Sequence, residues 1–588
     1  MIKHSMESSS SSIESSSSIE ELDPSPIDNN NNNNNNLNII NNNIITRTST
    51  IISNIIEDNK FAKSQTVPAP SFNYNEEIEE PEISNKEIST DVKDDGHYNK
   101  FDIDNKPPDK GFWAWTAAIC VMCINTFSWG VNASFGVYLN YYVTTNYFPG
   151  ATMEDYVMIG GLGLGLSFAL CAITNGLCRR FNYKIIMLIG TIITFISYWL
   201  ASISKTVVQL IMFQGFLMSI GWALVAGSTF VILPSWFLKK RSIAQGIATA
   251  GGGLAGVIFS RPIDSIIQLY LNDPKYENNK HEGLKLGIAW ALRMEAFVCG
   301  FILLISILLL RTYRPIKDDS LRGKGLKEFF LELIQFITRL DLIKQVPIFC
   351  LILWNMVYGL AYTILLFSLS SFASSIGLSY KQGSNVTIVQ SVAQTVGRPM
   401  LGIISEKLGR VNTTIIATIL ITIFVFFYWI FVETYSQLLG FAFVIGFFLG
   451  VNWVNFGPMA ADVVGGGGKD LNHAISIQMF MGGLPLLIAE LVGFKLRRPE
   501  MSKPFLYCQI LVGIAAIISA LLLLPFREWK IKRILVARRK ILNDKFQNDD
   551  NDIIADPTLH ENEIKRLDYM LQNNTTSYII RMFYPIAV

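Results

Sequence analysis

Residues 236–251 read Trp-Phe-Leu-Lys-Lys-Arg-Ser-Ile-Ala-Gln-Gly-Ile-Ala-Thr-Ala-Gly, and this stretch joins two long apolar runs. Three consecutive cations, Lys239, Lys240 and Arg241, end the first run, and the second run follows at once. Two apolar runs of bilayer length with a short charged connection predict a membrane hairpin. Because basic residues are enriched in cytoplasmic loops, we expect this connection to face the cytosol, which sets the orientation of every other span.

Small residues dominate the second run of the hairpin. Ala and Gly recur three to four positions apart between Ala244 and Gly256, and Gly246 and Gly251 are among them. Removing side-chain bulk from one face of a membrane helix lets a neighbouring helix or a solute approach its backbone. We therefore predict that the three cations, Gly246 and Gly251 act as a scaffold and gate rather than as the chemical centre.

Composition restricts the class of protein. Half of the 588 residues are apolar, 16% are charged and the net charge is +2, which gives no reason to expect a nucleic-acid partner. The seven cysteines show neither a disulfide framework nor zinc-ligand spacing. No catalytic triad, metal cluster or nucleotide-binding loop is visible, so we expect no enzyme activity, no metal and no cofactor.

Apolar runs of about 20 residues, enough to cross a bilayer, recur along the chain. Their positions are 112–142, 156–178, 184–203, 207–233, 242–267, 286–310, 347–373, 384–404, 413–432, 436–459, 471–496 and 505–525. They predict an all-α membrane protein with twelve transmembrane helices in two six-helix bundles. With both ends inside, the cytosolic loops carry about 17 Lys and Arg and the outer loops about nine, which agrees with this orientation.

The polar segments divide the chain into five parts. The predicted domains are 1–106, 107–310, 311–346, 347–526 and 527–588. The first is rich in Ser and Asn and is predicted to be a disordered cytosolic tail that regulatory factors could bind. The third is a cytosolic linker between two six-helix halves, an arrangement typical of transporters with a site between two repeats. The last begins with a basic run that we expect to lie against anionic lipid.

Three motifs resemble one family. Pro107–Trp115 (PPDKGFWAW), the hairpin at Trp236–Gly251 and Gly397–Gly402 (GRPMLG) resemble the monocarboxylate-porter branch of the major facilitator superfamily, and within it the fungal Mch homologues. The resemblance covers about residues 107–526 and implies the major facilitator fold and a monocarboxylate-like solute. It does not fix that solute, because the fungal homologues are a substrate-diverse group that includes riboflavin uptake.

Two positions depart from the proton-coupled members of that family. The resemblance places a substrate-binding lysine of the first helix at Ala133, and an aspartate four residues before the arginine of helix 8 at Gln394. The arginine itself is kept as Arg398. A proton-exchanging carboxylate and an anion-binding cation are thus missing together, so we do not expect lactate or pyruvate transport by that mechanism.

Charges within the membrane are costly, so each one needs a reason. Arg398, in the eighth run, is a candidate to hold an anionic solute group, and the alternative is a structural contact with Glu406 or the inner loops. Glu490, in the eleventh run, is the best remaining proton carrier if it faces the centre, and the alternative is an interaction with Lys495 or Arg497. Arg261 and Asp264 are three residues apart near the outer end of the fifth run and could form an ion pair, either as an outer gate or as an ordinary interfacial pair.

Polar and aromatic residues complete the predicted site. Trp129 and Asn132 lie on one face of the first helix with Asn125 and Ser128, which suits either a cavity or simple packing. Asn452 and Asn455 flank Trp453 in the tenth run and are candidates either to bind a polar solute or to bond neighbouring helices. The predicted substrate-binding residues are Arg398, Asn132, Trp129, Asn452 and Trp453.

The sequence therefore predicts a secondary active or facilitative transporter, a symporter in one form, that moves a small organic solute by alternating access. A monocarboxylate-like solute leads, and riboflavin or another heteroaromatic solute is the alternative. A non-transporting nutrient sensor that signals through its tails is the alternative from a different class. The predicted partners are the solute and the lipid bilayer, with the plasma membrane favoured and the vacuolar membrane open.

Overall fold

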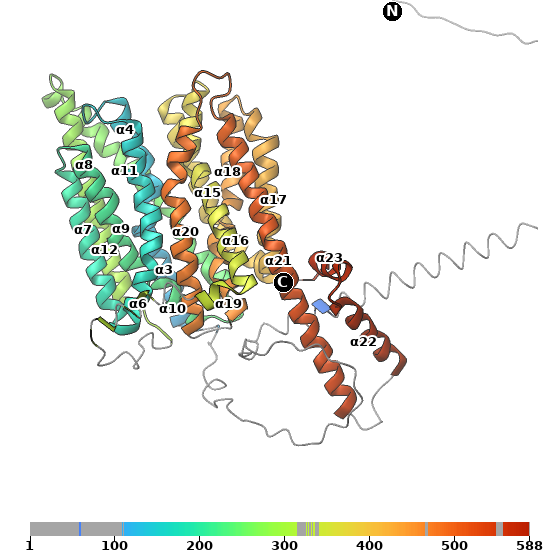
Figure 1. The fold of residues 1–588 in the computed structure, drawn as a ribbon. Helices are drawn as coiled ribbons and strands as arrows, with labels where there is room; N and C mark the ends of the chain where they lie inside the picture. The colour runs from blue at the N-terminus through green and yellow to red at the C-terminus, as the bar shows by residue number, and fades with distance from the viewer. Residues whose placement is uncertain are drawn as a thin grey trace, which may run out of the picture. The chain divides into compact units, whose positions relative to one another are not determined.

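The structure is a computed structural model that describes residues 58–59, 109, 111–313, 340–464, 469–548 and 557–586, with a few single positions between 325 and 334. Every regular element in these residues is a helix (Figure 1). Nearly all of the predicted tail at 1–106 and most of the predicted linker at 311–346 lie outside the described residues. The predicted domain boundaries remain predictions.

The amino-terminal half contains six spans, several of which are broken into shorter helical pieces. They are α3 (Phe112–Phe127) with η1 (Trp129–Ser134) and α4 (Phe135–Thr144); α5 (Met153–Gly161) with η2 (Leu162–Leu166) and α6 (Ser167–Arg180); α7 (Tyr183–Ser202); α8 (Val207–Leu210) with η3 (Ile211–Leu217), α9 (Met218–Ala226) and α10 (Thr229–Trp236); α11 (Arg241–Leu271); and α12 (Lys280–Leu309). Both η2 and η3 are π-helical. Such segments interrupt the regular ladder and often mark functional sites.

The carboxyl-terminal half also contains six spans. They are α15 (Val346–Ser375); α16 (Tyr380–Leu408); α17 (Arg410–Phe427); α18 (Tyr435–Leu449) with α19 (Val451–Val464); α20 (Lys469–Lys495); and α21 (Leu506–Asn548). Two shorter helices follow, α22 (Pro557–Leu571) and α23 (Thr575–Phe583). The described part of α21 runs about 20 residues past the apolar stretch that predicted it.

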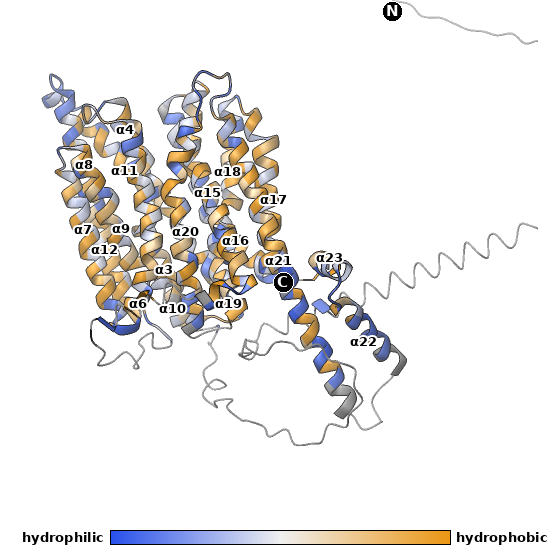
Figure 2. Cartoon of the chain, in the orientation of Figure 1, coloured by the Kyte–Doolittle hydropathy of each residue, from blue (hydrophilic) through white to orange (hydrophobic). Residues whose placement is uncertain are grey.

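Hydropathy and length account for eleven of the twelve spans. Ten helical stretches of the described residues are long and apolar enough to cross a membrane, and the bent pair Phe112–Phe127 and Trp129–Val143, which meets at 41°, makes an eleventh. The twelfth is α16, which has the length of a span at 29 residues but carries buried Gln390, Gln394 and Arg398. Its polar groups avoid lipid because the helix packs between neighbours. The predicted twelve-helix, two-bundle fold is confirmed (Figures 1 and 2).

Peripheral helices turn one apolar face outward. On α7, Ile185, Ile189, Ile192 and Ile196 recur three to four residues apart and are all exposed. A membrane protein exposes such a stripe to lipid, where large apolar side chains cost nothing to leave uncovered by protein. Figure 2 shows hydrophobic colouring along the spans, with hydrophilic residues gathered at their ends. The spans with the largest buried share are instead Met153–Arg180, Arg241–Leu271 and Val346–Ser375.

Glycines of α11 let it pack closely against both halves. A Cβ added at Gly253 would lie 2.6 Å from the carbonyl oxygen of Ser391 on α16, and one at Gly246 would lie 2.5 Å from the carbonyl oxygen of Arg398. Gly251 instead faces α3, where a Cβ would lie 2.7 Å from Thr126 Oγ1. Small residues allow this backbone approach, as the spacing predicted.

Two of the motifs that carry the family resemblance meet in space. The carboxylate of Asp109 accepts hydrogen bonds from the backbone N–H of Leu238, at 2.6 Å, and of Lys239, at 2.9 Å. The ammonium group of Lys240 lies 6.0 Å from the ring centroid of Trp115. The segment before the first helix thus caps the charged hairpin, because the hairpin's backbone N–H groups need an acceptor.

The end of the chain packs against the cytosolic extension of α21. Arg527 Nε donates to Asn412 Oδ1 at 2.7 Å, and Arg581 forms an ion pair with Glu528 at 2.6 Å. Lys530 pairs with Asp462 of α19 at 2.7 Å. Arg527 and Lys530, members of the basic run expected at the lipid surface, therefore bind protein groups instead.

Candidate functional site

The contact between the halves at the predicted cytosolic ends of the spans (the cytosolic contact) is built from hydrogen bonds and ion pairs around Ser242. Its backbone N–H donates to Glu406 Oε1 at 2.7 Å, and its hydroxyl oxygen accepts from Arg410 Nε at 3.1 Å. Arg410 is also paired with Asp462 at 2.5 Å and with Glu406 at 3.3 Å. On the opposite side of the junction, Asn175 Nδ2 donates to Ser476 Oγ at 3.0 Å. These bonds hold the halves together at their cytosolic ends.

An aromatic cluster forms the second layer, deeper in the membrane. Trp453 of α19 packs against Trp129 of η1 and Phe168 of α6, with ring centroids 5.9 Å and 4.8 Å apart. Tyr362 of α15 meets the same ring edge-on at 5.5 Å. Aromatic pairs at these separations contribute about 0.5–1.5 kcal/mol beyond area burial. Since these rings come from both halves, they pack the halves against each other at this level.

Arg398 lies fully buried beside this cluster. Its Nη2 donates to Gln394 Oε1 at 2.7 Å and to the Tyr362 hydroxyl at 3.1 Å, and its Nη1 donates to the backbone carbonyl of Thr249 on α11. Its Nε has no partner among the described residues. All three acceptors are neutral, so no carboxylate of the described residues pairs with this charge. Glu406, the predicted structural partner, binds Arg410 and Ser242 instead.

The two departures from the family pattern also reach this junction. Gln394 is the direct partner of Arg398, and it therefore occupies the place of a counter-ion without supplying a charge. Ala133 lies beside Gly256, where an added Cβ would be 3.4 Å from the Ala133 Cβ and 2.5 Å from Ser391 Oγ. A small side chain at position 133 allows this close packing.

Comparison with known proteins decides the family. The Major Facilitator Superfamily model matches residues 114–489 and 351–541. The chain belongs to the Major Facilitator Superfamily. The uncharacterized transporter ESBP6 of Saccharomyces cerevisiae is 29% identical over 538 residues, covering 90% of this chain and 77% of that protein. The probable transporter MCH2 of the same yeast is 27% identical over 475 residues, covering 80% and 93%.

Two solved structures of the superfamily share the fold. A human organic anion transporter, MFSD10 (TETRAN), gives a TM-score of 0.50 at 12% identity, covering 71% of this chain and 100% of that one. The transporter FucP in the outward conformation gives 0.50 at 13% identity, covering 68% and 96%. At these identities the likeness shows the fold alone. The resemblance to fungal Mch-type members is confirmed, and the chain is a multi-pass membrane transporter.

In this major facilitator transporter, the predicted site residues fall into two groups. Trp129 and Arg398 are neighbours, because a Cβ added at Gly252 would lie 3.3 Å from the Trp129 ring and 2.7 Å from Arg398 Nη1. Trp453 completes that group. Asn452 is set apart, since its Nδ2 donates to Asn355 Oδ1 at 3.2 Å within the carboxyl-terminal half. That bond is of the helix-to-helix kind that the sequence left as an alternative.

Asn132 and Glu490 form the second group, on either side of Gly160 in α5. Asn132 Nδ2 donates to the Gly160 carbonyl at 3.3 Å, and a Cβ added at Gly160 would lie 2.8 Å from Glu490 Oε2. Glu490 is buried, and this oxygen has no hydrogen-bond partner among the described residues. Its carboxylate thus faces the amino-terminal half, with no ion pair to Lys495 or Arg497 in the described structure.

The hairpin residues hold the backbone in place. Lys239 is exposed, whereas Arg241 is buried and its Nε donates to the Phe237 carbonyl at 2.8 Å. Gly246 packs on the backbone at Arg398, so the hairpin and the central cation are in direct contact. These positions accord with a scaffold role, and the gating role remains a prediction.

One predicted ion pair is wrong, and one acid was missed. Asp264 Oδ1 accepts a 2.6 Å hydrogen bond from the Tyr141 hydroxyl, while Arg261 is exposed and unpaired in the described structure. The three-residue spacing allowed an ion pair, but the carboxylate of Asp264 instead accepts the hydrogen bond of a tyrosine on the first span. Glu295 of α12 was overlooked although it interrupts an apolar run, a signal as clear as that of Glu490. It is buried and accepts from the Tyr138 hydroxyl at 2.9 Å.

Proposed function

We propose that this transporter moves a small organic anion of the monocarboxylate type by alternating access, with the plasma membrane as its site. The observation that carries the proposal is the fully buried charge of Arg398, which lies between the two halves and is bonded only to neutral acceptors among the described residues. A bound anion would supply the missing counter-charge.

Electrostatics supports an anion at this position. A buried charge without an ionic partner is destabilising, and it is retained in membrane proteins mainly where it works on a substrate or ion. Arg398 presents a planar guanidinium that suits two-point binding of a carboxylate. Gln394 and Tyr362, both on its own half, orient that group while leaving its charge free to act on the solute.

The same bonds link binding to alternating access. The Thr249 carbonyl belongs to α11 of the amino-terminal half and accepts from Arg398 of the carboxyl-terminal half. Separation of the halves at this level breaks that bond and would leave Nη1 without an acceptor. A carboxylate solute takes the place of the carbonyl, and therefore lowers the cost of the open form. A ligand shifts an equilibrium only through such a difference between states.

Glu490 is proposed as the proton carrier of a proton–anion symport. Its unpartnered oxygen lies at the junction of the halves, against the glycine backbone of α5. Transfer of a proton together with the anion would neutralise the solute's charge, which the membrane interior disfavours. Substitution by glutamine keeps the shape of this side chain and removes its titration.

Uptake of labelled monocarboxylates at pH 5 and pH 7 tests the proposal in cells that overexpress the chain. Arg398→Ala is expected to reduce saturable uptake to the level of empty cells, and Arg398→Lys to retain part of it because the charge remains without the planar fork. Arg261→Ala is the matched control, since Arg261 is an exposed cation near the outer end of α11. Glu490→Gln should lose the difference between the two pH values.

Two outcomes would overturn the proposal. Wild-type uptake by Arg398→Ala would remove Arg398 from the binding site. Absence of uptake in cells where surface labelling shows the protein at the plasma membrane would exclude monocarboxylate import. Labelled riboflavin is included in parallel, and its saturable uptake in place of monocarboxylates would move the solute to the heteroaromatic class.

A further inference from the structure

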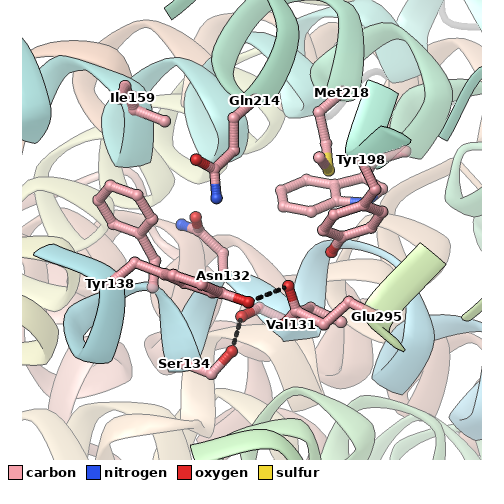
Figure 3. A pocket seen from close by; sticks show the side chains of 11 residues that line it. Val131, Asn132, Ser134, Tyr138, Ile159, Tyr198, Gln214, Met218 and Glu295 are labelled. Carbon is pink, nitrogen blue, oxygen red and sulfur yellow. Dashed lines mark hydrogen bonds between the residues drawn. The ribbon is translucent and has the colours of Figure 1, made fainter. Parts of the chain in front are cut away.

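A small cavity lies wholly within the amino-terminal half, apart from the junction that Arg398 occupies. Its volume is about 20 Å³, and side chains of five spans line it. A site of this size holds one water molecule. Glu295 of α12 closes one side, and Figure 3 shows Gln214 and Asn132 directing their amide groups into the same space.

Three polar atoms at this cavity have no hydrogen-bond partner among the described residues: Glu295 Oε1, Gln214 Oε1 and Trp222 Nε1. Glu295 is 1% exposed and Gln214 is 7% exposed, so bulk water does not satisfy them. Buried polar groups in folded proteins are nearly always bonded to protein or to ordered water. Two acceptors and one donor around a space for one water predict that a water molecule sits there.

The titratable groups that face Glu295 are three tyrosines and one cysteine, all of which are uncharged in their protonated forms. Tyr138 and Tyr142 face it from the first span and Tyr198 from α7, and Cys299 lies one turn further along α12. The residues that η3, α9 and α5 contribute are Gln214, Met218, Trp222 and Ile159. Arg293 is directed elsewhere, with its guanidinium 5.3 Å and 5.2 Å from the ring centroids of Trp199 and Trp290.

We propose that the Glu295 cavity is a proton-binding site of the amino-terminal half, in which the carboxyl group and one water molecule exchange the proton. One oxygen accepts from the Tyr138 hydroxyl, and the other is free to carry the proton. An ionised carboxylate here would be a buried charge without a cationic partner in the described structure, and a bound proton removes that cost. A metal ion fits poorly, because the site offers one carboxylate and room for one water.

The site is separate from the proposed function and does not depend on which solute is carried. Glu295 is walled by residues of the first six spans, whereas Arg398 and Glu490 face the junction. Asn132 borders both regions, since it lines the cavity and also donates to the Gly160 carbonyl beside Glu490.

Infrared difference spectra of the purified full-length protein, recorded during a titration from pH 5 to pH 9, test the site directly. The carbonyl band of a protonated carboxylic acid should disappear through this range in wild type and in Glu490→Gln, leaving in the latter only the Glu295 component. Glu295→Gln should lack that component. Tyr138→Phe keeps the carboxyl group and loses its hydroxyl partner, so the transition should persist with a changed midpoint.

Trp222 supplies a second readout, because its indole lines the same cavity. Its fluorescence, taken as the difference between wild type and Trp222→Phe, should change with pH in wild type and stay constant in Glu295→Gln. The proposal fails if Glu295→Gln, shown to be folded by its elution as a single species, retains the fluorescence transition, or if Glu295→Gln combined with Glu490→Gln retains the acid-band transition. It also fails if sodium chloride at fixed pH removes the acid band, which would assign the cavity to a sodium ion.

Discussion

Arg410 and Arg398 are both buried at the junction of the two halves, but their partners differ in charge. Arg410 is paired with the carboxylates of Asp462 and Glu406, at 2.5 Å and 3.3 Å. Arg398 is bonded to a carbonyl, a phenol and an amide. The charge of Arg410 in the cytosolic contact is thus balanced by carboxylates, whereas no carboxylate of the described residues balances the charge of Arg398.

The difference distinguishes a structural arginine, Arg410, from an arginine that can bind a solute, Arg398. A buried arginine that has its carboxylates gains little from a further anion, and removing it leaves those carboxylates uncompensated. A buried arginine without a carboxylate partner remains a strong anion site, because no ion pair offsets the free-energy cost of removing its charge from water. Three changes test this contrast, and they run from the largest expected effect to the smallest.

Arg410→Ala should be the most destabilising of the three. It leaves Glu406 without its ion pair and Asp462 with Lys530 alone, so we expect the free energy of unfolding to fall by about 3 kcal/mol. Thermal unfolding of the purified protein measures the loss, and Arg410→Lys, which keeps the charge, should lose less. Unchanged stability would mean that the cytosolic contact is not held by this arginine.

Gln394→Asp should weaken anion binding without harming the fold. The new carboxylate would replace the amide that now lies 2.7 Å from Arg398 and would compete with the solute for the guanidinium. We expect KM for the transported anion to rise about tenfold, which corresponds to about 1.4 kcal/mol. Gln394→Leu is the control that removes the hydrogen bond without adding charge. An equal KM in the two variants would show that Arg398 does not act through its charge.

Lys530→Met should have the smallest effect. Lys530 is partly exposed and shares Asp462 with Arg410, so the stability loss is expected to stay below about 1 kcal/mol. Uptake should remain unchanged. Lys532→Met, at a half-buried lysine that bonds Asn573 at 3.1 Å, is the matched control. A loss as large as that of Arg410→Ala would show that the extension of α21 clamps the cytosolic contact.

Much of the fold could be predicted because hydropathy is a local property. Most spans are long apolar runs, and α16 was predicted as the run 384–404 although it contains Gln390 and Gln394. The orientation that the hairpin at Lys239–Arg241 predicts remains a prediction, whereas its glycines do pack on neighbouring backbones. Among the intramembrane charges, Arg398 and Glu490 could be singled out because a single charged residue in such a run is conspicuous.

The bonding partners of the charged and polar side chains could not be predicted from the sequence. Asp264 was expected to pair three residues away, yet it bonds to Tyr141, 123 residues earlier in the chain. Asp109 caps a loop 129 residues later, and no periodicity signals that contact. Asn452 had two possible roles by sequence, and the position of Asn355 on another helix gives it a hydrogen bond.

The sequence by itself determined the number of spans and placed two charges, Arg398 and Glu490, within them, because these follow from the free energy of transferring short segments into lipid. Only the tertiary structure decided which charges are compensated. Arg398 and Arg410 lie twelve residues apart and differ because helices distant in sequence bring carboxylates to one and neutral groups to the other. Glu295 acquired its cavity for the same reason, since five separate spans build its walls.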